Sequence, residues 1–294
     1  MPLVLGCFAL GVLMRRVAPR TDDLSRLLDR AVISVLLPAL VLAKLPEIPF
    51  EARAVIPVAV AWSAVAVGAA AVLALSRLRG WDRRVTGTLL LVTPLGNTSF
   101  LGFAAVEALL GRDHLPPAIA YDQLGSFLAL VTYGSIVATR YGGGGPGGAP
   151  PALRDAWRFP PFVALLIGVG LRVTGIGLPA AEAFDAIGRL VGPVALSALG
   201  LRFTLAVQRR HMGPVAGCLV VRMGVIPALA LAASTLAGGG LEWSTSVLEA
   251  GAPPMVTAGV VAAAVGLDAE LAVTVVGLGL LLALGTLPLL AFLV

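Results

Sequence analysis

"TPLGNTSFLG" (93–102) places one proline, two glycines and three small polar side chains inside a long apolar run. Proline removes a backbone donor and clashes with the preceding helical turn, glycine permits unusual backbone dihedrals, and hydroxyl or amide side chains can cap freed helix ends. At membrane depth, non-helical backbone survives only when it is buried in protein or lines a cavity. The stretch therefore predicts a transmembrane helix that breaks near residues 94–99. The residues concerned are Pro94, Gly96, Asn97, Thr98, Ser99 and Gly102.

The composition of the chain places this stretch in a membrane. Hydrophobic residues make up 58% of the 294 residues, charged residues 13%, and the mean hydropathy is +0.96. A soluble domain carries about 25% charged residues. We predict an all-α integral membrane protein without a soluble domain. The two cysteines both fall in apolar segments and are too few for a disulfide framework.

Apolar stretches predict ten transmembrane helices. The expected ranges are 2–14, 31–46, 54–76, 85–110, 114–139, 160–176, 187–206, 213–237, 243–265 and 270–293. The first range is shorter than the roughly twenty residues that cross a bilayer. It is either a truncated helix or a cleaved signal peptide, and no small-residue cleavage site precedes the arginines that follow it.

Lysine and arginine predict the orientation. Fourteen of them lie in the loops that follow the first, third, fifth and seventh spans, and five lie in the opposite loops. Because positive loops stay in the cytoplasm, we expect a multi-pass protein of the plasma membrane with both termini outside. The same arginines would face anionic lipid, which explains the pI near 10 without nucleic-acid binding.

A weak internal repeat divides the chain into two halves. Pro38 corresponds to Pro193, Pro94 to Pro253, and the ordered matches keep offsets of 155 to 159 residues. Five spans in each half is an odd number, so the two halves must be inverted relative to each other. We expect a first five-helix repeat (1–139), a cytoplasmic linker rich in glycine and proline (140–159), and a second repeat (160–294).

The second half contains its own helix-breaking stretch, "GAPPMVTAG" (251–259), at the matched position. Two interrupted spans at corresponding positions indicate a binding site near the midplane, where half-helix N-termini attract anions. Two simple proline kinks are the alternative. The candidate substrate-binding residues are Pro94, Gly96, Asn97, Thr98, Ser99, Asp122, Gln123, Arg222, Pro253, Pro254, Met255 and Thr257.

Two charged residues are expected deep in the membrane, where charges are costly and often functional. Arg222 would lie about 14 Å into its span at 1.5 Å per residue, and Asp122 at a similar depth from the other side. Arg222 could balance a substrate carboxylate, and Asp122 could bind a proton or order the site. Alternatively, the two could form a structural pair that locks helices together.

The remaining titratable residues suggest no second site. Glu107 and Glu249 are expected to reach water near the outer interface, and His114 and His211 to be solvated at span ends. The sequence contains no zinc-ligand, Walker or nucleophile-elbow motif, so we expect no metal, no cofactor and no enzymatic activity. An intramembrane enzyme and a non-transporting receptor are the rival classes. The first lacks a catalytic set, and the second would have no reason to keep two matched breaks.

"GNTSFLGFAAVEALLG" (96–111) resembles the fourth-span motif of the auxin efflux carrier family of membrane transporters, which runs roughly Asn-Thr-Gly-Phe-Leu-Gly. "GAPPMVTAGVVAA" (251–263) resembles that family's ninth span, and weaker similarity covers the whole chain. Ser99 stands where the family usually has glycine. The family belongs to the bile acid/auxin/arsenite transporter superfamily.

The resemblance implies two inverted five-helix repeats whose fourth and ninth helices are broken and cross each other, as in sodium/proton antiporters and bile acid symporters. It implies a transport domain, a scaffold domain and a homodimer through the scaffold helices. It also implies a secondary transporter of small organic anions, such as malate, malonate or an auxin-like acid, working by alternating access. A sodium- or proton-coupled symporter or antiporter with an inorganic ion as substrate is the alternative.

Overall fold

The computed structural model describes residues 2–17, 21–44, 55–143, 160–202 and 208–294. Within these ranges the protein is helical, and the one β-type contact is an isolated antiparallel bridge between Gly96 and Pro254. Most of the expected linker, 144–159, lies outside the described residues. The protein is therefore an all-α protein, as its composition predicts.

Helix lengths and hydropathy agree with a membrane protein. Four described helices are long and apolar enough to cross a bilayer: Val55–Arg79, Ala181–Leu201, Arg209–Leu236 and Ala269–Ala291. Shorter apolar helices include Thr98–Leu109 and Val163–Thr174.

The helical elements follow one another in chain order through both halves. The first half contains α1 (Pro2–Val17), α2 (Thr21–Ala31), η1 (Val32–Leu36), α3 (Leu37–Lys44), α4 (Val55–Arg79), α5 (Arg83–Val92), η4 (Thr98–Gly102), α6 (Phe103–Leu109), η5 (Arg112–His114), α7 (Leu115–Ala120), η6 (Tyr121–Phe127), η7 (Leu130–Gly134) and α8 (Ser135–Tyr141). The second half contains α9 (Pro160–Thr174), α10 (Ala181–Gly188), α11 (Val191–Arg202), α12 (Arg209–Val220), η9 (Val221–Val225), α13 (Ile226–Leu236), α14 (Leu241–Ala250), α15 (Val256–Ala264) and α16 (Ala269–Ala291).

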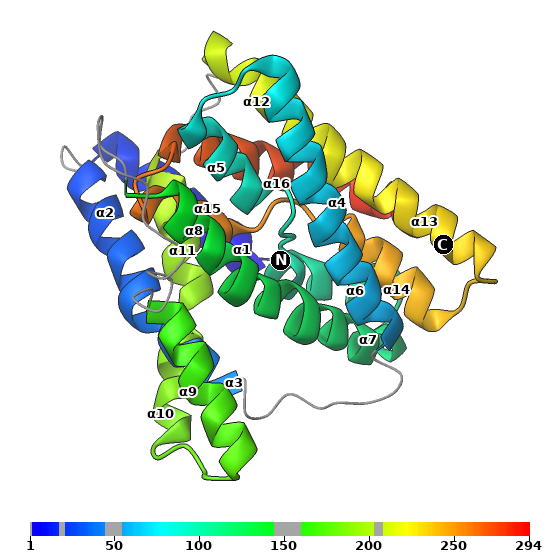
Figure 1. The fold of residues 1–294 in the computed structure, drawn as a ribbon, viewed down its shortest axis with the longest axis horizontal. Helices are drawn as coiled ribbons and strands as arrows, with labels where there is room; N and C mark the ends of the chain where they lie inside the picture. The colour runs from blue at the N-terminus through cyan, green and yellow to red at the C-terminus, as the bar shows by residue number, and fades with distance from the viewer. Residues whose placement is uncertain (1, 18–20, 45–54, 144–159, 203–207) are drawn as a thin grey trace.

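The helices pack in two groups (Figure 1). In one group α1 and α2 pack on α11, and α3 packs on α9 and α10. In the other, α4 packs on η6, α14 and α5, while α13 packs on α14. Helix α15 contacts α2 and α11 of the first group as well as α5 and α16 of the second, so it lies where the groups meet.

A close approach between small residues holds α1 against α11. A methyl group added at Gly11 would lie 2.9 Å from the Cα of Gly200, and it would also meet the carbonyl oxygen of Ser197. Helices in lipid gain little from the hydrophobic effect, so small residues that let backbones approach are a main source of their association. Gly11 is therefore required at this contact for its size.

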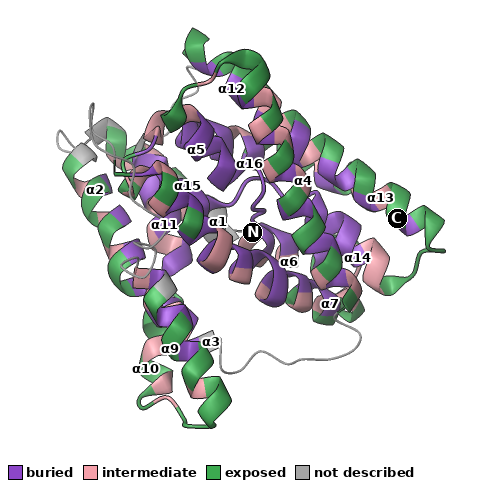
Figure 2. Ribbon diagram, in the orientation of Figure 1, coloured by how far each residue is buried: buried purple, intermediate pink, exposed green. Residues whose placement is uncertain are grey.

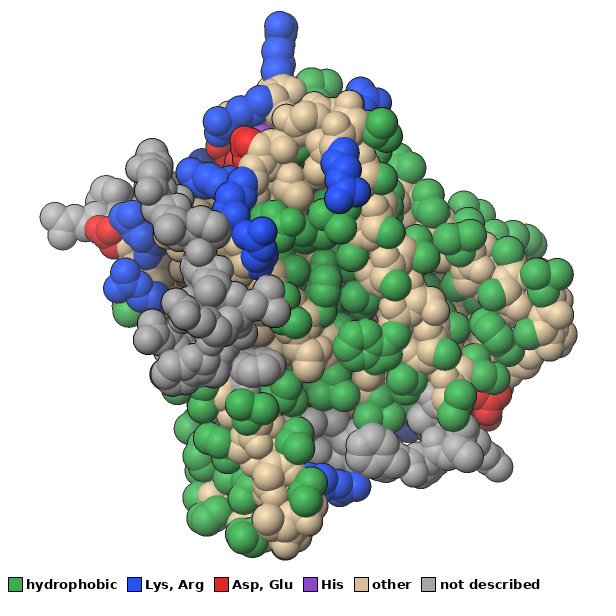
Figure 3. Space-filling view, viewed as in Figure 1, with side chains coloured by type: hydrophobic (Ala, Val, Ile, Leu, Met, Phe, Trp, Pro, Cys, Tyr) green, Lys and Arg blue, Asp and Glu red, His purple; other side chains and the backbone are tan. Residues whose placement is uncertain are grey.

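Burial is greatest where two helices are interrupted. Every residue from 86 to 98 and from 245 to 262 is buried, whereas α4 and α13 expose apolar side chains along their outer faces (Figure 2). Figure 3 shows lysine and arginine side chains gathered at the end of the molecule where α4 ends and α12 begins, above a wide apolar surface. This distribution matches a belt of lipid-facing surface bordered by a basic end.

Candidate functional site

Two interrupted helices cross at the centre of the protein. Helix α5 ends at Val92 and η4 begins at Thr98, while α14 ends at Ala250 and α15 begins at Val256. We call the two non-helical segments, 93–97 and 251–255, the crossing. The backbone N–H of Asn97 donates to the carbonyl oxygen of Pro253 at 2.8 Å.

A second hydrogen bond completes the crossing, from the backbone N–H of Met255 to the carbonyl oxygen of Leu95 at 2.9 Å. Together the two bonds form the antiparallel bridge between Gly96 and Pro254. They satisfy backbone groups that the breaks remove from the helices, and a buried unpaired group would be costly. The predicted breaks thus lie where two chain segments can pair with each other.

Local chemistry explains why the chain leaves the helix here. Pro94, Pro253 and Pro254 cannot donate a helical hydrogen bond. A proline also disfavours the helical conformation in the residue before it, which affects Ala252 and Pro253. The expectation that Gly96 supplies unusual dihedrals is wrong, because its φ is not positive. A Cβ at this position would instead strike the guanidinium of Arg222, so a glycine is needed for close approach.

Arg222 of η9 is 1% exposed and binds the crossing through backbone carbonyls. Its Nε donates to the carbonyl oxygen of Ala252 at 2.9 Å and its Nη1 to that of Pro94 at 3.1 Å. A longer contact of 3.4 Å joins Nη2 to the carbonyl oxygen of Glu249. These carbonyls lie at the C-terminal ends of α5 and α14, which carry partial negative charge. Arg222 therefore joins the two breaks to each other.

Asp122 of η6 lies at the other end of the crossing, where η4 begins. Its Oδ1 accepts from the hydroxyls of Thr98 and Ser99, each at 2.5 Å. Its Oδ2 accepts from the side-chain amide of Gln123 at 2.9 Å. The two hydroxyls therefore hold Asp122; no side chain caps the start of η4. No described ion pair joins Asp122 to Arg222.

A small cavity opens at the starts of η4 and α15. We call it the crossing cavity. It measures about 40 Å³. Its lining residues are Leu37, Leu40, Asn97, Thr98, Ser99, Phe100, Asp122, Phe127, Leu130, Val191, Met255 and Thr257. The Nδ2 atom of Asn97 is buried and has no hydrogen-bond partner among the described residues. The cavity thus contains a free donor next to two helix N-termini.

An adjoining cavity of about 240 Å³ extends this space toward α10. It shares five lining residues with the crossing cavity and adds Gln123, Gly188 and Arg189. Both cavities lie between the two helix groups, because Leu40 of α3 faces the crossing there. The space is therefore large enough to admit a small molecule between the groups.

The structure gathers the predicted site residues around the crossing in three roles. Those that line the two cavities are Asn97, Thr98, Ser99, Asp122, Gln123, Met255 and Thr257. Those that build the crossing without lining either cavity are Pro94, Gly96, Pro253 and Pro254. Arg222 lines neither cavity and binds the crossing from outside them.

Sequence reasoning missed Glu249. The expectation that it reaches water is wrong, since it is 0% exposed and neither carboxyl oxygen has a hydrogen-bond partner among the described residues. It lies on the last turn of α14, directly before the break. Its place one helical turn ahead of Pro253 was the available signal. Glu107, by contrast, reaches the surface and pairs with Arg112 at 2.8 Å.

The two histidines also differ from expectation. His211 is buried, and its Nε2 lies 3.0 Å from the Oδ2 of Asp268, at the start of α16. His114 is partly buried, with its Nδ1 2.7 Å from the hydroxyl of Thr245. Both rings therefore contribute to helix packing rather than standing free in solvent. Within the described residues, no group of three or more histidine, cysteine and acidic side chains could hold a metal.

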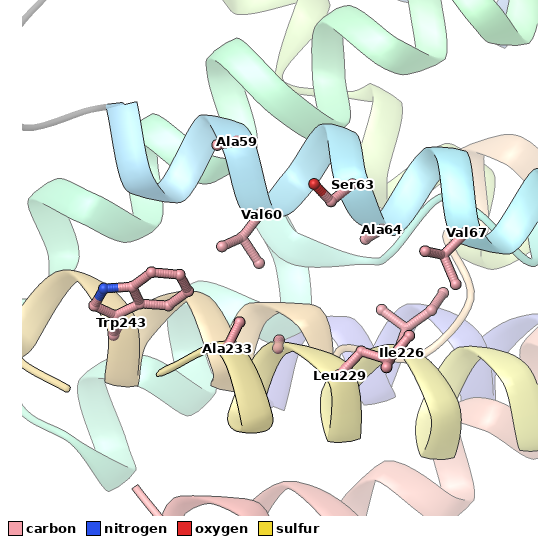
Figure 4. Close-up of a pocket in the computed structure, with 10 residues that line it drawn as sticks. Ala59, Val60, Ser63, Ala64, Val67, Ile226, Leu229, Ala233 and Trp243 are labelled. Atoms are coloured by element: carbon pink, nitrogen blue, oxygen red, sulfur yellow. The ribbon is translucent and has the colours of Figure 1, made fainter. Parts of the chain in front are cut away.

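A third cavity, of about 180 Å³, lies away from the crossing between α4 and α13. Figure 4 shows Ala59, Val60 and Val67 of α4 facing Leu229 of α13, with Trp243 at one end. Its lining is almost wholly apolar, and Ser63 is the only hydroxyl. Such a lining offers an anion no convergent donors, so the crossing is the stronger candidate site.

Comparison with known proteins agrees with this arrangement. A family model described as "Membrane transport protein" matches residues 14–145 and 149–291. The chain is 29% identical over 293 residues to an uncharacterized transporter of Methanothermobacter thermautotrophicus, covering 97% of this chain and 94% of that protein. It is also 29% identical over 175 residues to an uncharacterized transporter of Methanocaldococcus jannaschii, covering 57% of this chain and 55% of that one. The chain belongs to the membrane transport protein family, the auxin efflux carrier family that its fourth- and ninth-span motifs resemble.

Proposed function

We propose that this membrane transporter is a secondary carrier that moves a small organic anion, a carboxylate such as malate, malonate or an auxin-like acid, by alternating access. In this proposal the protein lies in the plasma membrane with both termini outside. Its halves form two inverted five-helix repeats, and the broken fourth and ninth helices bind the substrate where they cross.

The unpartnered Asn97 amide carries the proposal. It lines the crossing cavity beside Thr98, where η4 begins, and Thr257, in the first turn of α15. Helix N-termini present free N–H groups and partial positive charge, which together favour an anion. A buried donor without a partner costs free energy unless a ligand supplies an acceptor. A substrate carboxylate would supply that acceptor.

Arg222 has a different part in this proposal from direct binding of the substrate. Its two shorter hydrogen bonds go to the carbonyl oxygens of Ala252 and Pro94. It therefore neutralises the C-terminal ends of the half-helices and leaves their partners' N-terminal ends for the anion. We assign Arg222 the role of holding the crossing in shape.

Asp122 gives a specific reason to keep an ion-coupled carrier as the second candidate. Its carboxyl lines both cavities, and an ionised carboxylate there would repel an anionic substrate. Binding of a proton or a small cation would remove that repulsion. Coupling to a proton or sodium, with the anion or the ion itself as the transported species, follows from this arrangement.

The two helix groups supply the moving parts. In our proposal the group built on α4, α13, α14 and α16 carries the crossing and moves as the transport domain. The group built on α1, α2, α3, α9, α10 and α11 is the scaffold and provides a homodimer contact. The cavities between the groups would open to alternate sides as the transport domain moves.

A thermal-shift screen tests the proposal. The purified protein in detergent is melted with malate, malonate, lactate or indole-3-acetate, at two pH values, with and without sodium. A ligand at a hundred times its Kd stabilises the folded state by about 2.7 kcal/mol. We expect a shift from at least one carboxylate that Asn97→Ala abolishes. Shifts from sodium or pH alone would favour the inorganic-ion carrier, and the absence of any carboxylate shift would contradict the anion proposal.

A further inference from the structure

Glu249 has the strongest unexplained chemistry in the described structure. It is fully buried on the last turn of α14, and its Oε1 and Oε2 both lack a hydrogen-bond partner among the described residues. A Cβ built on Gly102 would come within 2.7 Å of the Glu249 Cδ, so the carboxyl group lies directly against the backbone of η4. The side chain therefore joins the half-helix before one break to the half-helix after the other.

An ionised carboxylate does not fit this environment. Burying an unpaired charge without hydrogen bonds is far more costly than burying a neutral acid. Asp122 shows the contrast, because three donors within 2.9 Å surround its carboxyl group. The surroundings of Glu249 instead fit a carboxylic acid that has taken up a proton.

The ligand that fits Glu249 is a proton rather than a metal cation. Sodium needs several oxygen ligands, and the atoms nearest the Glu249 carboxyl belong to a glycine backbone. No described cluster of three or more metal-binding side chains includes it. Only a species without a coordination shell can reach these oxygens in the arrangement seen here.

The charged and titratable groups near Glu249 come from two elements. Tyr121 and Asp122 belong to η6, and Arg222 belongs to η9. Helices α4, α13 and α16, which also pack on α14, carry no ionisable side chain at this level. Farther toward the outer end, the packed elements present Glu107, Arg112, Asp113 and His114.

Arg222 connects the charge of Glu249 to the shape of the crossing. Its guanidinium binds the carbonyl oxygens of Pro94 and Ala252, and no ion pair within 4.0 Å joins it to the Glu249 carboxyl. If Glu249 lost its proton, the new negative charge would attract the guanidinium away from those carbonyls. The crossing would lose the donors that hold its two breaks together.

We propose that Glu249 is a proton-binding site of the transport cycle, protonated while Arg222 holds the crossing closed and ionised when the crossing loosens. The proposal rests on the alternating-access carrier and names the proton as its coupling ion. It predicts that proton release from Glu249 and loosening of the crossing are one event.

Two measurements on the full-length protein in detergent or proteoliposomes test this inference, and neither needs an organic anion. The first is infrared spectroscopy of the carboxylic acid C=O band during a pH titration. We expect a band from a carboxyl group free of hydrogen bonds, lost in Glu249→Gln and kept in Glu107→Gln. Glutamine mimics the protonated acid in shape, so this variant should fold. A band that Glu249→Gln leaves unchanged would overturn the proposal.

The second measurement is hydrogen/deuterium exchange of the crossing amides, corrected for the intrinsic pH dependence of exchange. The reporters are the backbone N–H groups of Asn97 and Met255, which form the bridge. We expect their protection to fall as the pH rises in the native protein and in Glu107→Gln, and to stay high in Glu249→Gln. Equal pH dependence in all three proteins would refute the coupling. Because no anion is present, failure of the anion proposal would leave both readouts unaffected.

Discussion

Replacing Gly96 with alanine should damage the crossing more than any contact count at the backbone suggests. The new methyl would lie 2.8 Å from the Cζ of Arg222, well inside van der Waals contact. A free arginine side chain would simply swing away. Here it is held by hydrogen bonds of 2.9 and 3.1 Å to the carbonyl oxygens of Ala252 and Pro94, so it must break at least one of them.

The expected cost follows from two terms. A hydrogen bond to a charged group contributes about 1.5–3 kcal/mol, and an added methyl in a packed core costs about 1–3 kcal/mol. The sum is about 3–6 kcal/mol. At about 2 °C per kcal/mol for a chain of this size, Gly96→Ala should lower the melting temperature by about 6–12 °C.

The assay is thermal unfolding of purified protein in detergent, with Gly224→Ala as the matched control. Gly224 lies two residues from Arg222 in η9, and a Cβ there meets nothing within 4 Å. Alanine is favoured over glycine in a helix by about 0.5–1 kcal/mol, so the control should be as stable as the native protein or slightly more so. A Gly96→Ala variant that melts within about 1 °C of the native protein would refute the role assigned to Arg222.

Two further predictions concern single contacts. Thr98→Val keeps the side-chain shape and removes the hydroxyl that lies 2.5 Å from Asp122, so it should cost about 1–3 kcal/mol in the same melting assay; native stability would contradict this. Gly11→Leu should force α1 away from Gly200 of α11 and sharply reduce the yield of folded protein, whereas Gly6→Leu, where a Cβ meets nothing within 4 Å, should not. Equal yields of the two leucine variants, measured by size-exclusion chromatography, would contradict the packing account.

The features that the sequence could predict depend on local covalent chemistry. The breaks follow from prolines at 94, 253 and 254, which prevent helical hydrogen bonding whatever surrounds them. The all-α membrane character follows from composition alone. The matched position of the two breaks came from the internal repeat, which requires only ordered similarity between the halves.

The features that the sequence could not predict depend on partners distant in the chain. Arg222 was expected near the midplane, but its acceptors are backbone carbonyls on two other elements, which no side-chain pattern indicates. Glu249 was placed near water by counting from the start of its span. Helix α14 is only 10 residues long, so its last turn already lies at the buried crossing. His211 was misjudged similarly, because Asp268 covers it from another helix.

The most direct test of the central claim is solute counterflow in proteoliposomes, using the carboxylate that gives the largest thermal shift. Vesicles loaded with unlabelled carboxylate should transiently accumulate the labelled compound from outside when they contain native protein or Glu107→Gln. Those with Asn97→Ala should not, since the substitution removes the free donor in the crossing cavity. Counterflow by Asn97→Ala at the native rate, or none by the native protein, would contradict transport of an organic anion through the crossing.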